Sequence, residues 1–180
     1  MLATACSEPP QKEIDQAQAA VDLARTGGAE IYAAEEYTAA AAGLQKAHAA
    51  VDQRDYRQAL SHAIDARQRA QSALRQAGEG KGKAQREAEI TMAAASTQLT
   101  RLEARLAAAE AAKLPAKELR APRAVLADAR KSLQEARTVI GAENYARAGE
   151  ILTAVRKNLD HAIQDVEKIP QRAPRTPRRR

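Results

Sequence analysis

The sequence contains no phenylalanine and no tryptophan, and only four tyrosines. The aromatic and β-branched side chains that strands favour are therefore scarce. Alanine, the best helix former, makes up a quarter of the 180 residues, and the other common residues (Leu, Gln, Glu, Arg and Lys) follow it closely in helix propensity. The composition predicts an all-α protein. Its core should be thin and its helices should lie close together, because alanine buries little surface.

Side chains that carry chemistry are also few. Three histidines are present: His48, His62 and His161. None has a cysteine partner or the spacing of a zinc site. Ser61 and Asp65 share a helix face that His62 does not, so this group is not a catalytic triad. We therefore expect no catalytic residue, no metal ligand and no cofactor, and we expect that the protein is not an enzyme.

Long hydrophobic runs are missing, since charges interrupt every apolar stretch well before the roughly 20 residues that span a bilayer. Membrane attachment would have to come through the single cysteine. Leu2-Ala3-Thr4-Ala5-Cys6 looks like the end of a bacterial lipoprotein signal, although Ala3 stands where leucine is more usual. The basic and apolar parts of such a signal do not precede it, so this interpretation requires a start upstream of Met1. We predict lipidation of Cys6; the alternative is a cytoplasmic N-terminus with an incidental thiol.

The net charge of +6 is concentrated at one end of the chain. Residues 171–180 contain five arginines and no acidic residue: Arg172, Arg175, Arg178, Arg179 and Arg180. The remaining chain is almost neutral, which argues against a nucleic-acid interface spread over the whole molecule. The tail could bind an anionic surface (nucleic acid, lipid headgroups or lipopolysaccharide) or simply add solubility.

Apolar residues recur at helical spacing in two copies that lie 89 residues apart. The first copy is Tyr37, Ala40, Leu44, Ala47, Val51, Tyr56, Ala59, Ala63, Ala66, Ala70, Ala73 and Ala77. The second copy is Leu126, Ala129, Leu133, Ala136, Ile140, Tyr145, Ala148, Leu152, Val155, Leu159, Ala162 and Val166. Steps of three and four within each copy are typical of a helix packed on another helix. The pattern predicts two related helical hairpins, and we call these residues the repeated seam.

Capping residues, glycines and prolines along the chain predict six helices. They are expected at 11–27, 34–52, 55–77, 84–113, 122–140 and 144–168. Asp55 with Gln58, and later Asn144, are expected to cap the second arm of each hairpin. The glycines of Gly78–Lys83 predict a turn, because glycine is poor inside helices and the spacing does not fit a phosphate-binding loop.

These elements predict an elongated bundle of two repeated three-helix units, each a hairpin with a preceding helix. The expected divisions are 1–10 (lipobox-like N-terminus and spacer), 11–77 (first unit), 78–83 (turn), 84–168 (second unit with a long first helix) and 169–180 (disordered Arg/Pro tail).

Residues 28–77 resemble a bacterial domain-of-unknown-function family that occurs in small outer-membrane lipoproteins and beside OmpA-like modules. The residues that carry the resemblance are Gly28, Ala29, Tyr32, Glu36, Tyr37, Ala40, Leu44, Ala47, Asp55, Tyr56, Ala59 and Leu60. Ala34 stands where the family often has proline. The resemblance implies a helical, non-enzymatic module in the cell envelope.

Together these observations predict a periplasmic lipoprotein, anchored to the outer membrane through Cys6, that acts as a structural or accessory scaffold. It would bind an envelope protein through its helix faces, and it could also form homo-oligomers. The alternative is a cytoplasmic helical module that binds nucleic acid or another polyanion through its arginine tail.

Overall fold

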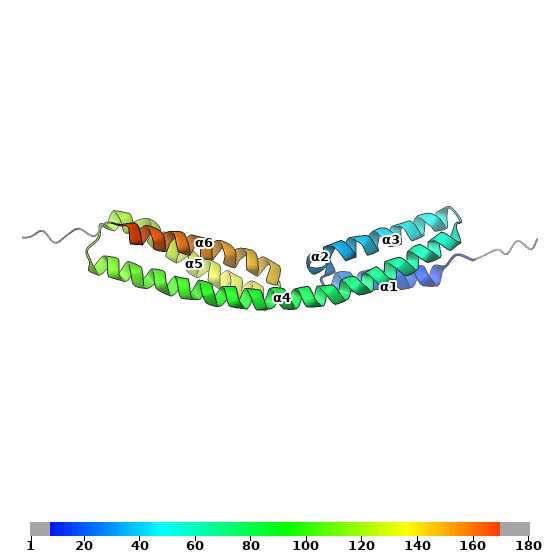
Figure 1. Ribbon diagram of the computed structural model, residues 1–180, viewed down its shortest axis with the longest axis horizontal. Coiled ribbons are helices and arrows are strands. Elements are labelled where there is room, and N and C mark those ends of the chain that lie inside the picture. The colour runs from blue at the N-terminus through cyan, green and yellow to red at the C-terminus, as the bar shows by residue number, and fades with distance from the viewer. Residues whose placement is uncertain (1–7, 170–180) are drawn as a thin grey trace, which may run out of the picture. The chain divides into compact units, whose positions relative to one another are not determined.

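The computed structural model describes residues 8–169 and contains helices but no strands in that range. The all-α prediction is therefore confirmed. Six helices follow one another along the chain (Figure 1): α1 (Gln11–Thr26), α2 (Ala29–Tyr32), α3 (Ala34–Asp52), α4 (Tyr56–Ala111), α5 (Ala116–Gly141) and α6 (Tyr145–Lys168). They form two compact units, which divide between Lys83 and Ala84 within α4.

Unit 1 contains α1, α2, α3 and the first half of α4. Side-chain contacts give the directions of its helices. Gln16 of α1 bonds Arg67 of α4, and Gly27 lies against Leu74, so α1 and α4 run parallel. Arg69 forms an ion pair with Glu36 of α3 at 3.5 Å, and Gly43 of α3 lies against Ala66, so α3 runs antiparallel to α4. The core of this unit is mostly alanine, and it has Ile14, Val21 and Leu44 as its larger buried side chains.

Unit 2 contains the second half of α4 together with α5 and α6. Gln98 and Arg101 of α4 bond Asp160 and Glu167 of α6, so these two helices run parallel. Arg130 with Glu103, and Arg123 with Glu110, join α5 to α4 in the antiparallel sense; in each pair Nε and Nη2 donate to the same oxygen, Oε1. Its core has more leucine than that of unit 1. The largest fully buried side chains are Leu102, Leu119, Leu152 and Leu159.

The repeated seam faces inward in both copies. Every one of its residues is buried or half-buried, including Ala66 and Leu152, which are fully covered. The small side chains allow the close helix approach that composition predicts. A Cβ added to Gly43 of α3 would lie 3.2 Å from the Cβ of Ala66 in α4. The burial of the seam therefore determines which face of each helix points to the core.

The expected turn at Gly78–Lys83 is wrong, because these residues lie inside α4. The two helices expected at 55–77 and 84–113 are one helix of 56 residues. Gly80 packs against α2, where an added Cβ would lie 2.9 Å from the carbonyl oxygen of Tyr32. The absence of a side chain at Gly80 therefore permits a close contact between backbones. It does not end the helix, even though each glycine costs about 1 kcal/mol relative to alanine.

The expected start of a helix at 122 is also wrong, since α5 begins six residues earlier, at Ala116. Pro122 lies inside the helix, where it removes one backbone hydrogen bond. Both Pro122 and Leu119 are buried in the core of unit 2. Burial of Leu119 and the two bonds from Arg123 to Glu110 favour the helical conformation here and offset the cost of the proline.

The predicted caps are present at both hairpins. The backbone N–H of Gln58 donates to Asp55 Oδ1 at 3.0 Å, and the side chain of Gln58 donates to Oδ2 at 2.9 Å. The backbone N–H of Arg147 donates to Asn144 Oδ1 at 3.2 Å. These bonds satisfy donors that the first turn of a helix leaves free, and they determine where α4 and α6 begin.

Candidate functional site

The three histidines lie on separate helices. His48 is exposed on α3, His62 is half-buried on α4, and His161 is exposed on α6. Asp65, which follows His62 on α4, accepts a bond of 3.0 Å from Arg69 Nε. Within residues 8–169, no cluster of His, Cys, Asp or Glu side chains has a composition that could hold a metal ion.

Two sets of predicted site residues lie outside the described residues. These are Cys6, the predicted lipidation site, and the arginines of the tail, Arg172, Arg175, Arg178, Arg179 and Arg180. Both therefore stay predictions. In the described range, none of the helices combines the length and the apolar character needed to cross a membrane.

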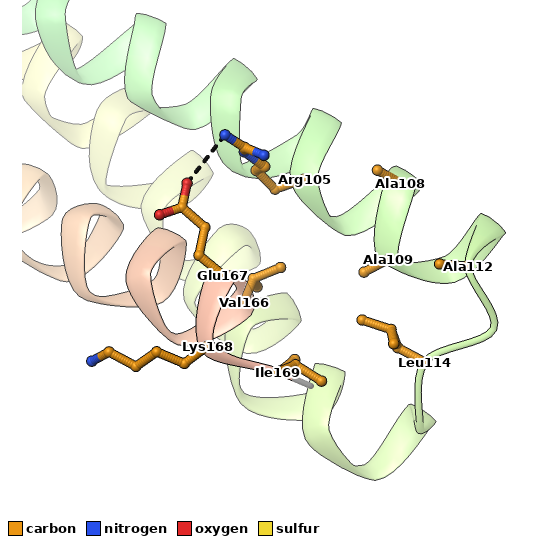
Figure 2. A pocket seen from close by; sticks show the side chains of 9 residues that line it. All are labelled: Arg105, Ala108, Ala109, Ala112, Leu114, Val166, Glu167, Lys168 and Ile169. Carbon is orange, nitrogen blue, oxygen red and sulfur yellow. Dashed lines mark ion pairs between the residues drawn. The ribbon is translucent and has the colours of Figure 1, made fainter. Parts of the chain in front are cut away.

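A cavity of about 420 Å³ lies in unit 2, where α4 and α6 end (Figure 2). We call it the end cavity, and it is lined by Arg105, Ala108, Ala109, Ala112, Leu114, Val166, Glu167, Lys168 and Ile169. Leu114, from the segment after α4, projects toward Val166 and Ile169 (Figure 2). Most of the lining is apolar, and small alanines form the α4 side, so the cavity suits an apolar group.

Charged residues surround the end cavity. Arg105 Nη2 and Glu167 Oε1 form an ion pair of 3.2 Å across the space between α4 and α6. Arg101 pairs with the same carboxylate at 3.2 Å. Lys168 makes no ion pair within residues 8–169 and extends away from the cavity in Figure 2. Two arginines therefore share one carboxylate here, which leaves the edge of the cavity more basic than acidic.

A second cavity, of about 480 Å³, lies between the middle of α6 and α4 within unit 2. We call it the Arg156 cleft, and it is lined by Glu87, Thr91, Thr153, Arg156, Lys157, Asp160, His161 and Gln164. Polar and charged side chains make up its lining. Such a lining can recognise a charged ligand but offers little to an apolar one.

The sequence alone did not identify either cavity. Leu114 lies between two helices, where no periodicity assigns it to a face. Asp160 follows Arg156 by four residues, a spacing that suggests a pair on one helix face. In the structure, Asp160 Oδ1 instead accepts a bond of 2.6 Å from Gln98 of α4. Only the packing of α4 on α6 shows that Arg156 is left without this partner.

Comparisons with known proteins give one match. No curated protein and no solved structure matches the chain. Residues 12–90 match a sequence family described as a domain of unknown function (DUF4398). The matched region begins in α1, includes α2 and α3, and extends into α4. The expected resemblance to a domain-of-unknown-function family is thus confirmed, and residues 12–90 of this chain are similar to DUF4398.

Proposed function

We propose that this protein is a non-enzymatic scaffold of the cell envelope that binds a partner protein through its helix faces. The observation that carries the proposal is the end cavity, an apolar space with a basic edge. Apolar anchors that enter such a space contribute most of the binding free energy in many protein interfaces. The protein would therefore work by contact between helices and without chemistry on a substrate.

The end cavity also suggests the chemistry of the partner. Its alanine wall leaves room for a side chain of the size of leucine or isoleucine. Arg101 and Arg105 share the single carboxylate of Glu167 at the edge, and the excess positive charge favours an acidic residue beside that apolar anchor. We expect the partner to present an apolar side chain flanked by a carboxylate.

The partner site can be tested with one substitution and a matched control. Ala112→Glu places a carboxylate in the end cavity, whereas Ala116→Glu makes the same change at an exposed alanine that does not line it. We expect a protein that copurifies with the tagged full chain to be lost with Ala112→Glu and kept with Ala116→Glu, as measured by quantitative mass spectrometry. An unchanged set of copurifying proteins would exclude the end cavity as the partner site.

The location is proposed from Leu2–Cys6, where small residues precede the cysteine. In this proposal, Cys6 is lipidated and anchors the scaffold to the outer membrane on its periplasmic side. Mass spectrometry of the protein from its native cells should find a diacylglyceryl thioether on Cys6, and Cys6→Ser should move the protein to the soluble fraction. An unmodified Cys6 in a cytoplasmic fraction would contradict this location.

A second candidate rests on the five arginines of residues 171–180. In this alternative, the protein is a cytoplasmic module that binds nucleic acid or another polyanion through its tail. Binding would then collapse when residues 171–180 are deleted. It would also weaken with salt, with a log–log slope of about −4.5 for five phosphate contacts on duplex DNA. Binding that does not depend on the tail would remove this alternative.

A further inference from the structure

Arg156 is a half-buried cation that has no partner in the part of the chain that the structure describes. It makes no hydrogen bond and no ion pair with any residue between 8 and 169, and its Nε is buried and unsatisfied. A buried polar atom normally has a hydrogen-bond partner, so an exception calls for an explanation. Because one edge of the guanidinium is shielded from water, its charge is less well hydrated than that of an exposed arginine.

Other arginines at the helix interfaces of unit 2 have a carboxylate. Arg101 and Arg105 share Glu167, each at 3.2 Å. Arg123 and Arg130 each approach a glutamate of α4 to 2.7 Å. Arg156 therefore differs from these four arginines in that no carboxylate of residues 8–169 balances its charge.

The equivalent position of the repeated pattern gives a comparison within the same chain. Arg67 precedes Arg156 by 89 residues and bonds the side chain of Gln16 in unit 1. In unit 2, the carboxylate nearest in sequence, Asp160, is held by Gln98 of α4. Arg156 is thus left with its charge directed to the Arg156 cleft, which it lines.

The other residues of the Arg156 cleft add charges and hydrogen-bond donors. Lys157 adds a second positive charge, His161 adds a titratable ring, and Thr91 and Thr153 add hydroxyl donors. Glu87 and Asp160 are the two carboxylates of the lining. The amide of Gln98 donates to Asp160 but leaves its charge in place, so Glu87 and Asp160 both oppose an anion, and Arg156 with Lys157 must outweigh them locally. The buried Nε is closed to a ligand, so an oxyanion would bond the terminal nitrogens Nη1 and Nη2 of Arg156 through charge-assisted hydrogen bonds, which are short and strong.

We propose that the Arg156 cleft binds an oxyanion, either a carboxylate or a phosphate, through Arg156 with help from Lys157. The cleft lies within unit 2 and shares no lining residue with the end cavity. The proposal therefore goes beyond the scaffold function and does not depend on it. The carboxylate could come from an acidic peptide, and the phosphate from a small molecule or a headgroup.

The test uses the full chain and inorganic phosphate, followed by nuclear magnetic resonance. We expect saturable shifts of the α6 amides around Arg156, with a dissociation constant in the millimolar range. Arg156→Met keeps the apolar stem and removes the charge, and it should weaken binding at least tenfold. Arg67→Met is the matched control, because it removes the equivalent arginine of unit 1, and it should leave binding unchanged.

A stability measurement and one further variant keep the result interpretable. Arg156→Met should melt no lower than the wild type, since replacing an unpaired, half-buried charge by an apolar side chain is not destabilising. Loss of binding in a variant with unchanged melting cannot be attributed to unfolding. Glu87→Gln removes the opposing carboxylate and should tighten phosphate binding severalfold.

A second series of titrations identifies the source of the oxyanion. Acetate and a short glutamate-containing peptide are titrated beside phosphate, and whichever binds more tightly identifies the preferred group. Either preference supports the proposal as long as Arg156→Met abolishes it. Shifts that do not saturate, or that are equal in wild type and Arg156→Met, would overturn the proposal.

Discussion

Arg54 and Glu143 adopt the same left-handed backbone conformation, with φ of 58° at each, and Glu143 follows Arg54 by 89 residues. The hydrogen bonds around them also correspond. The N–H of Asp55 donates to the carbonyl of Ala50 at 2.9 Å, and the N–H of Asn144 donates to that of Val139 at 3.1 Å. Helices α3 and α5 therefore end in the same C-terminal motif, in which Arg54 and Glu143 occupy the position where glycine is usual.

This geometry predicts that Arg54→Gly stabilises the protein. A left-handed conformation is strained for an L-residue with a Cβ, and glycine removes the strain. We expect a gain of about 0.5–1 kcal/mol in the free energy of unfolding, measured by urea denaturation. Arg75→Gly, at an exposed position inside α4, is the control and should lose about 1 kcal/mol. Equal effects at the two positions would contradict the assigned strain.

Gly78 and Gly80 should respond oppositely to alanine. Nothing lies within 4 Å of a Cβ added to Gly78, so Gly78→Ala should stabilise α4 by about 1 kcal/mol. A Cβ on Gly80 would lie 2.9 Å from the Tyr32 carbonyl oxygen, and Gly80→Ala should destabilise by up to about 2 kcal/mol. Thermal unfolding followed by circular dichroism measures both. If residues 78–83 formed a flexible turn, neither substitution would have an appreciable effect.

The thin core of unit 1 predicts that it does not tolerate larger side chains. Ala66 is fully buried against Gly43, so Ala66→Leu should overpack the contact between α3 and α4. We expect a loss of about 1–3 kcal/mol. Gln68→Leu adds the same side chain at an exposed position of α4 and should change stability by less than about 0.5 kcal/mol. The urea midpoints of the two variants give the comparison.

Tyr37 predicts a loss of stability at alkaline pH. Partial burial, together with a hydrogen bond to the Glu30 carboxylate and its charge, raises the pKa of Tyr37 above the ordinary tyrosine value. The folded state therefore favours the protonated phenol. This contribution is complete below the unfolded pKa of about 10 and is lost as the pH rises through the folded value.

Melting temperatures of wild type and Tyr37→Phe between pH 8 and pH 11 test this assignment. The advantage of the wild type should shrink as the pH rises above about 10, because phenylalanine does not ionise. Parallel curves for the two proteins would show that other groups cause the alkaline loss.

Much of the architecture followed from local patterns. The repeated seam identified the buried faces, because steps of three and four residues place side chains on one stripe of a helix. The bounds of α3 were predicted to the residue, and Asp55 and Asn144 were predicted as caps from their chemistry alone. The duplication itself stays a prediction from the 89-residue spacing.

Both corrections concern residues whose local preference was outweighed by a distant contact. From the sequence alone, Gly80 is expected to break a helix, but in the structure it lies inside α4 and against the carbonyl of Tyr32. From the sequence alone, Pro122 is expected to start a helix, but the burial of Leu119 favours an earlier start. Local propensities amount to about 1–3 kcal/mol, which is within the range that tertiary packing can offset.

The amino-acid sequence by itself determined that this protein is helical, which helix faces are buried and where the capped helices begin, since these depend on periodicity and on neighbours within a few residues. Only the tertiary structure decided that α4 continues through its glycines, that the end cavity forms around Leu114, and that no carboxylate of residues 8–169 pairs with Arg156. Each of these depends on which side chains of separate helices meet, and the spacing of residues along one helix does not determine that.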